Sequence, residues 1–182
     1  MSKFNAKAIC RIAALAALYF LLNMVSIKAG NLRITFASLP VVVSALLFGP
    51  LESVLVALFG ELLNQLLSYG LTATTLLWLV PPAVRGLTVG LLAARLWRTG
   101  RPLETRPVLC YGICVLAALC TTVANTLIIW LDSVLLHYYS AAYVFGQLFY
   151  RLGSGVVIAV IIATVAMPLA GLLRRQGIAR RV

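Results

Sequence analysis

The segment GELLNQLLSYG, residues 60–70, places three polar side chains in an otherwise apolar run. Glu61, Asn64 and Gln65 stand at positions i, i+3 and i+4, so they share one face if the run is helical. The apolar run itself, residues 51–68, is long enough to cross a membrane. A carboxylate inside a bilayer costs about 2.5–3.5 kcal/mol on insertion scales, so such residues usually face a partner or a cavity. We therefore expect a membrane-spanning helix with a dedicated polar face.

The composition of the whole chain indicates an integral membrane protein. Of its 182 residues, 63% are hydrophobic and 10% charged, and the mean hydropathy is +1.05. The net charge of +11 does not indicate a nucleic-acid partner, because most Lys and Arg flank apolar segments, where membrane topology places them. The four cysteines lie in apolar segments and match no metal or redox spacing, so we expect no metal site.

Gly, Pro and charged clusters divide the chain into six apolar segments. We predict an all-α fold of six transmembrane helices in a single domain, 1–182, with spans near 9–27, 37–48, 51–68, 76–97, 108–131 and 144–173. The second segment is shorter than the roughly 20 residues that a straight transmembrane helix needs, so it must be broken, tilted or shielded by neighbours.

The positive charges predict that both termini are cytoplasmic, since this orientation puts eleven of the fifteen Lys and Arg residues on the inner side. Topology gives no reason for the other four cations, which are therefore candidates for function: Lys28, Arg33, Arg85 and Arg151.

Several polar residues are candidates for an external binding pocket. Glu61 and Arg85 lie at comparable depth on neighbouring spans, and we leave open whether they form an ion pair or contact a ligand. Asn64 and Gln65 are either helix–helix contacts or ligand contacts. Arg33 and Arg151 could form the cationic side of a pocket for a carboxylate-bearing ligand. The remaining candidates are Tyr69, which continues the polar face outward, Trp78, which could stack on an aromatic ring, and Gln147, one turn from Arg151.

An enzyme is not indicated, because the chain has four acidic residues, one His and no HExxH or GxSxG motif. We expect no catalytic residue. There is no Walker A motif either, so another chain must bind any ATP that drives transport.

The first apolar segment carries a small-xxx-small pair, Ala13 and Ala17, which lets a second helix approach closely. It is followed by NLRITFASLPVVVSALLFGP, residues 31–50, and then by the span with Glu61. In these features, and in size and six-span layout, the chain resembles the substrate-binding S components of energy-coupling factor (ECF) vitamin transporters.

This resemblance implies a multi-pass subunit of the bacterial plasma membrane that captures a vitamin at its outer end. It implies that Ala13 and Ala17 dock on a transmembrane coupling subunit, which is bound to two cytoplasmic ATPases, and that the chain itself binds no cofactor. The loop from about Lys28 to Ala37 would close over the ligand as a lid. The RITFASLP wording favours the folate-type branch, with pantothenate, cobalamin or another vitamin as alternatives.

Two other functions are compatible with the residues. The chain could be an autonomous carrier in which titration of Glu61 couples transport to protons, because intramembrane carboxylates serve in that way. It could also be a membrane scaffold without a ligand, which the off-topology cations make the weaker interpretation.

Overall fold

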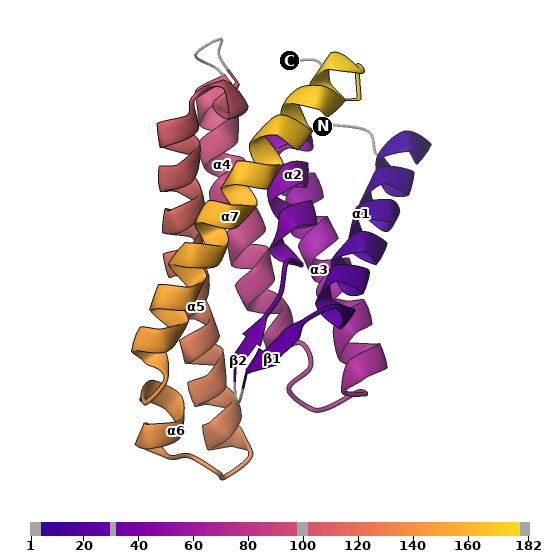
Figure 1. Ribbon diagram of the computed structural model, residues 1–182. Coiled ribbons are helices and arrows are strands. Elements are labelled where there is room, and N and C mark those ends of the chain that lie inside the picture. Colours follow the sequence, from indigo (N-terminus) through magenta and orange to yellow (C-terminus); the bar gives the residue numbers. More distant parts are fainter. Residues whose placement is uncertain (1–4, 30–31, 98–101, 179–182) are drawn as a thin grey trace.

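A computed structural model describes residues 5–29, 32–97 and 102–178, and for residues 27–34 it describes the backbone only. The described chain is a helical bundle (Figure 1). It contains α1 (Ala6–Met24), α2 (Ser38–Phe48), α3 (Pro50–Ser68), α4 (Val80–Trp97), α5 (Pro107–Leu135), the short α6 (Ala141–Phe145) and α7 (Leu148–Arg175). Two 3₁₀ turns, η1 (Leu77–Leu79) and η2 (Leu103–Thr105), precede α4 and α5.

The helices confirm the predicted all-α membrane fold. Five stretches are long and apolar enough to span a bilayer: α1, α3, η1 with α4, α5, and α6 with α7. The predicted sixth span, 144–173, is divided into α6 and α7, and the fifth continues four residues beyond its predicted end at 131. An antiparallel hairpin of β1 (Ile27–Ala29) and β2 (Leu32–Ile34) joins α1 to α2, with Lys28 opposite Arg33 in its register.

The short second helix is shielded by its neighbours. α2 packs against α1, α3, α4 and α7, and its residues from Val41 to Phe48 are all buried. Leu46 and Ala45 have no exposed surface. Because other helices surround α2, its length does not have to match the thickness of the bilayer.

Helices α3 and α4 approach closely through two glycines of α4, Gly86 and Gly90. A Cβ atom on Gly90 would lie 2.4 Å from Pro50 Cα, and one on Gly86 would lie 2.8 Å from Ser53 Oγ. Small residues four apart permit this close packing, which in a membrane replaces the hydrophobic drive that lipid does not provide. The glycines therefore hold α4, and with it Arg85, against α3.

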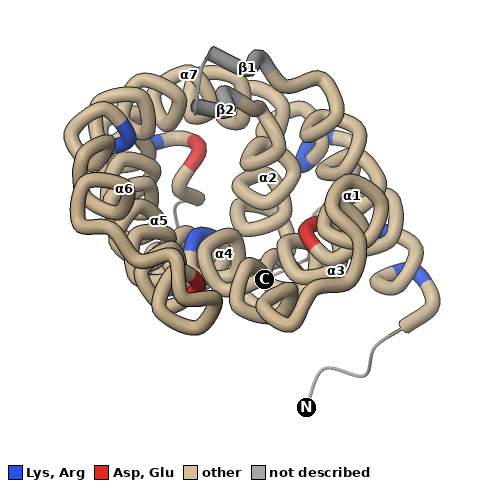
Figure 2. Tube along the Cα trace, turned by 90° about the horizontal axis from the view of Figure 1, so that it is seen from below, with Lys and Arg blue, Asp and Glu red and all other residues tan. Residues whose placement is uncertain are grey.

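The bundle has two ends, each marked by different elements of the chain. The start of α1 and the end of α7 lie at one end, which we call the termini end, and the β1–β2 hairpin and α6 lie at the opposite end, which we call the hairpin end (Figure 1). Seen from the hairpin end, most of the chain carries no charge (Figure 2). Having both described ends together is compatible with both termini being cytoplasmic, and which side they face stays a prediction.

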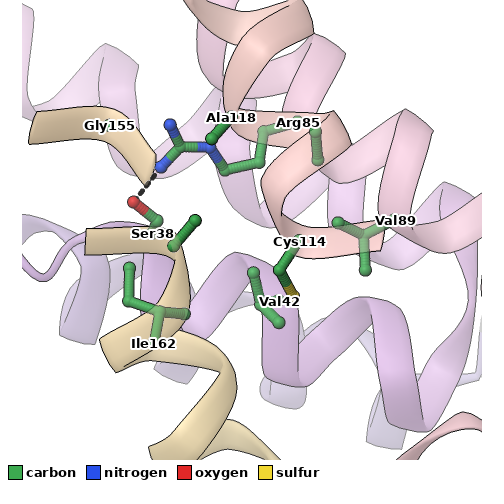
Figure 3. Close-up of a pocket in the computed structure, with 10 residues that line it drawn as sticks. Ser38, Val42, Arg85, Val89, Cys114, Ala118, Gly155 and Ile162 are labelled. Atoms are coloured by element: carbon green, nitrogen blue, oxygen red, sulfur yellow. Dashed lines mark hydrogen bonds between the residues drawn. The ribbon is translucent and has the colours of Figure 1, made fainter. Parts of the chain in front are cut away.

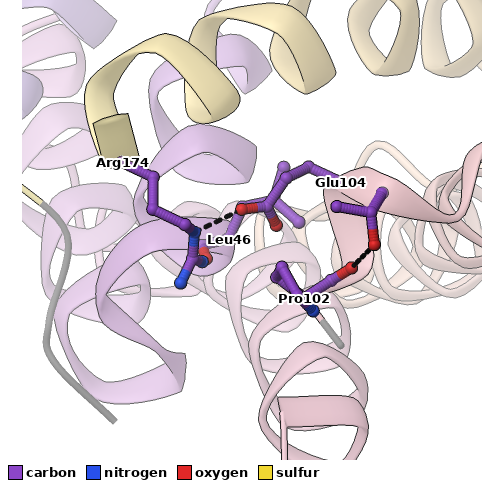
Figure 4. A network of polar contacts seen from close by, with 5 residues as sticks. Leu46, Pro102, Glu104 and Arg174 are labelled. Atoms are coloured by element: carbon purple, nitrogen blue, oxygen red, sulfur yellow. Dashed lines mark hydrogen bonds and ion pairs between the residues drawn. The ribbon is translucent and has the colours of Figure 1, made fainter. Parts of the chain in front are cut away.

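Two arginines contact the last turn of α2 at the termini end. Arg174 forms an ion pair with the buried Glu104, and its Nη2 donates a hydrogen bond to the carbonyl oxygen of Leu46 at 3.1 Å (Figure 4). Arg11 forms an ion pair with Glu52 at 3.0 Å and lies 4.3 Å from the centre of the Phe48 ring. A cation at a helix C-terminus stabilises carbonyl groups that have no partner in the helix. Both arginines therefore have structural contacts in addition to their expected place in the topology.

Candidate functional site

Arg85 lies in a pocket between α2, α4, α5 and α7 (Figure 3). Its Nε donates a hydrogen bond to Thr121 Oγ1 at 3.3 Å, and its Nη1 donates one to Ser38 Oγ. The rest of the lining is apolar or small: Val42, Val89, Cys114, Ala117, Ala118, Gly155, Ala159 and Ile162. An apolar cavity with a few placed polar groups is the usual form of a small-molecule site.

The sequence builds this pocket from small residues on two facing helices. Ala117 and Ala118 on α5 lie across from Gly155 and Ala159 on α7, and the lack of large side chains leaves space beside Arg85. The cavity volume beside Arg85 is only about 10 Å³, roughly the space of one water molecule, whereas most ligand sites have roughly 300–1,000 Å³. A vitamin-sized ligand would therefore require the elements around the pocket to move apart.

Glu61 belongs to a separate polar cluster between α1 and α3. Its Oε2 accepts a hydrogen bond from Tyr19 Oη at 2.7 Å, and its Oε1 accepts bonds from Asn64 Nδ2 at 3.0 Å and Gln65 Nε2 at 2.8 Å. Ser68 extends the cluster by donating to Asn64 Oδ1 at 3.2 Å. The Glu61 residue is only 8% exposed, so these three donors replace the water that would otherwise solvate the carboxylate.

Of the two alternatives left open for Glu61 and Arg85, the ion pair between them is not formed in the described chain. In the described chain the ion pairs are Arg11–Glu52 and Arg174–Glu104. Glu61 is directed toward α1, where Tyr19 lies, whereas Arg85 is directed toward α2 and α5. The Glu61 carboxylate is bonded by side chains of α1 and α3, and the Arg85 guanidinium by side chains of α2 and α5. The depth of a residue, estimated from the sequence, does not give the direction of its side chain.

The other candidate residues are distributed over the hairpin end and α1. Trp78 is half-buried in η1, and Tyr69 is 60% exposed at the end of α3. Gln147 stands at the N-cap position of α7 without a side-chain capping bond. Arg151 follows one turn later, half-buried, and lies one turn from the pocket residue Gly155. The Arg33 side chain lies outside the described residues. The structure thus brings Glu61, Asn64 and Gln65 together but places them apart from the pocket that holds Arg85.

The proposed docking pair has the exposure that a helix–helix contact needs. Ala13 and Ala17 are both exposed on α1, whereas Ile12, Ala16 and Tyr19 are buried. The small-residue face is therefore directed away from the rest of the described bundle.

Three polar residues of these clusters were not singled out by the sequence reasoning: Tyr19, Ser38 and Thr121. Tyr19 continues a stripe on α1, after Ile12 and Ala16 at helical spacing, and that stripe is the signal that could have shown its inward direction. Ser38 and Thr121 are common residue types whose importance depends on Arg85 reaching them. A fourth residue, Asp132, lies near the hairpin end of α5 and is only 6% exposed.

A family model described as "ECF-type riboflavin transporter, S component" matches residues 3–175. A solved structure described as "Structure and mechanism of the S component of a bacterial ECF transporter" has a TM-score of 0.67 with this chain, at 21% sequence identity, covering 93% of this chain and 98% of that chain. No curated protein matches the sequence.

The comparisons agree with the S-component resemblance but not with its predicted branch. The matching model is of the riboflavin type, so the folate-type branch is not confirmed. The solved structure supports the fold alone at this level of identity.

Proposed function

Because the chain belongs to the family of ECF-type riboflavin transporter S components, we propose that it captures riboflavin from the hairpin end of the bundle and delivers it inward as part of an ATP-driven importer. As a member of this family it is the substrate-specific, multi-pass membrane subunit of a transporter in the bacterial plasma membrane, and not an enzyme. The capture of riboflavin, the ATPases and the direction of transport are parts of the proposal.

The observation that carries the proposal is the pocket around Arg85. Its lining is apolar or small, which suits the flat ring system of a flavin, and its polar donor suits the ring carbonyl oxygens. In the described chain Arg85 bonds only hydroxyl groups, those of Ser38 and Thr121. A ligand carbonyl could replace either hydroxyl without leaving the guanidinium in apolar surroundings.

The exposed pair Ala13 and Ala17 is the proposed contact with the coupling subunit. Small residues let two helices approach within membrane-packing distance, and α1 presents both alanines outward. We propose that the coupling subunit connects this face to two cytoplasmic ATPases, which bind and hydrolyse ATP while this chain binds no cofactor.

The proton-coupled carrier is less well supported. In that alternative Glu61 would exchange protons with a transport pathway, yet its carboxylate is buried and accepts bonds from Tyr19, Asn64 and Gln65. Glu61 does not line the pocket that holds Arg85. The arrangement favours a structural role for Glu61 between α1 and α3.

The test is riboflavin binding by the detergent-purified chain, followed by quenching of flavin fluorescence. We expect saturable binding that Arg85→Met weakens at least tenfold, since one hydrogen bond to a charged group contributes about 1.5–3 kcal/mol. Arg95→Met is the matched control, because Arg95 is an exposed residue near the termini end of the same helix. No binding by the wild-type chain would refute the riboflavin proposal, and equal affinities of the Arg85 variant and wild type would remove Arg85 from the site.

A further inference from the structure

A buried carboxylate at the hairpin end has one oxygen without a partner. Asp132, near the end of α5, is 6% exposed, and its Oδ2 accepts a hydrogen bond from the Tyr138 hydroxyl. Its Oδ1 is buried and has no hydrogen-bond partner among the described residues. Leaving a buried charged acceptor unsatisfied costs more than leaving a neutral one.

The Tyr138 hydroxyl holds this carboxylate in one orientation. The Tyr138 side chain is 42% exposed, and partial desolvation, followed by the hydrogen bond to Asp132, raises the pKa of its hydroxyl. The hydroxyl is protonated at neutral pH and donates to the carboxylate. Its ring meets the Tyr143 ring edge to face, with centroids 5.7 Å apart and an interplanar angle of 79°. Tyr138 therefore fixes Oδ2 and leaves Oδ1 for another donor.

Asp132 lies on the same stripe of α5 as the pocket. Cys114 and Ala118 line the pocket, and Thr121 accepts a hydrogen bond from Arg85. The same helix face continues at spacings of three and four residues through Asn125 and Ile128 to Asp132. Asp132 follows Thr121 by eleven positions, which corresponds to roughly 16.5 Å along the helix axis. This distance is comparable to the length of a three-ring flavin with an extended ribityl chain.

An unpartnered donor lies on the facing helix at the same end. Arg151 of α7 stands one turn from Gly155, which lines the pocket, and its Nη1 is buried without a hydrogen-bond partner among the described residues. No ion pair joins Arg151 to Asp132, although both are described. An acceptor on α5 and a donor on α7 thus stand at the hairpin-end side of the pocket with unused hydrogen-bonding capacity.

We propose that Asp132 Oδ1 accepts a hydrogen bond from the bound vitamin, with Tyr138 as its positioning residue. The inference rests on the proposed riboflavin function and extends it to the ligand groups that would be recognised at the hairpin end of α5. Riboflavin offers two kinds of donor to a carboxylate, the imide N–H of the ring and the hydroxyls of the ribityl chain. A carboxylate cannot accept from a ligand carboxylate, so Asp132 also disfavours placing an anionic group at this position.

The experiment compares three flavins on the wild-type chain and on Asp132→Asn. Riboflavin carries both donors, 3-methylriboflavin lacks the imide N–H, and lumiflavin lacks the ribityl hydroxyls. We expect Asp132→Asn to weaken riboflavin binding about 10- to 100-fold, the range for a hydrogen bond to a charged group. We also expect the wild-type preference for riboflavin over one analogue to disappear in the variant. The analogue that shows this loss identifies the donor.

Tyr138→Phe provides a second variant that keeps the carboxylate, and Tyr139→Phe is its control. Tyr139 is the next residue and is 50% exposed. We expect Tyr138→Phe to weaken riboflavin binding several-fold and to reduce the same analogue preference, and we expect Tyr139→Phe to leave both at the wild-type values.

Two results would overturn the inference while leaving the proposed function intact. One is wild-type riboflavin affinity in both Asp132→Asn and Tyr138→Phe. The other is an equal loss of affinity for all three flavins together with a lower melting temperature of the ligand-free chain, which would show a structural role. Failure of the wild-type chain itself to bind riboflavin would overturn both proposals.

Discussion

Tyr19→Phe tests the assignment of Glu61 to a structural cluster. The substitution removes the Tyr19 hydroxyl, which donates to Glu61 Oε2 at 2.7 Å, and leaves the donors of Asn64 and Gln65 in place. The ring remains, and it packs so closely on α3 that a Cβ atom on Gly60 would lie 2.6 Å from it. The variant therefore loses a hydrogen bond without opening a cavity.

The expected cost is about 1.5 kcal/mol. Hydrogen bonds to charged groups contribute about 1.5–3 kcal/mol in proteins, whereas interhelical hydrogen bonds within membranes reach about 1.7 kcal/mol at most. The two ranges overlap near the lower value. For a chain of this size, that loss corresponds to a melting temperature lower by about 3–6 °C.

A double-mutant cycle in detergent identifies the partner of Glu61. Tyr19→Phe and Glu61→Gln should be non-additive by about 1 kcal/mol, because their side chains are in direct contact. Arg85→Met and Glu61→Gln should add within about 0.5 kcal/mol. If Tyr19→Phe and Glu61→Gln were additive while Arg85→Met and Glu61→Gln were strongly coupled, the assignment of Glu61 to the Tyr19 cluster would be refuted. Arg85 would then be the partner of Glu61.

Three further predictions concern packing and assembly. Arg174→Ala should lower the free energy of unfolding by about 3 kcal/mol, because it leaves the buried Glu104 and the Leu46 carbonyl without their donor; an unchanged melting temperature would contradict this. Gly90→Ala should cost about 1–3 kcal/mol through the contact with Pro50, whereas Gly112→Ala, whose Cβ meets nothing within 4 Å, should be neutral or slightly stabilising; equal effects would argue against close packing of α3 and α4. Ala13→Trp should preserve riboflavin binding and abolish co-purification with the coupling subunit, and Leu91→Trp, at an exposed site on α4, should preserve both; assembly of the Ala13 variant would exclude α1 as the docking face.

The membrane-spanning pattern could be predicted because it depends on local composition. The segments 51–68 and 37–48 differ from the observed α3 and α2 by one residue at their starts. Apolar runs separated by Gly, Pro and charge determine helix positions with little help from tertiary structure. The short length of the second segment predicts that it is broken, tilted or shielded by neighbours, and shielding is what α2 shows.

The direction of side chains within the bundle could not be predicted in the same way. Glu61 and Arg85 have suitable charge and depth for an ion pair, but the rotation of each helix directs them toward different neighbours. Helix rotation depends on close contacts such as Gly90 against Pro50 and Gly60 against the Tyr19 ring, which join residues far apart in the sequence. Asp132 illustrates the same limit, because its burial arises from contacts beyond its own helix face, including Tyr138.

Native mass spectrometry of the purified chain shows whether it captures riboflavin. The full chain is purified in detergent from cells grown in rich medium, alongside Arg85→Met, and each spectrum is searched for a bound small molecule. We predict a one-to-one complex with the mass of riboflavin in the wild-type sample and its loss or strong reduction in the variant. A wild-type chain that carries a different vitamin, or that stays empty after riboflavin is added, would contradict the account.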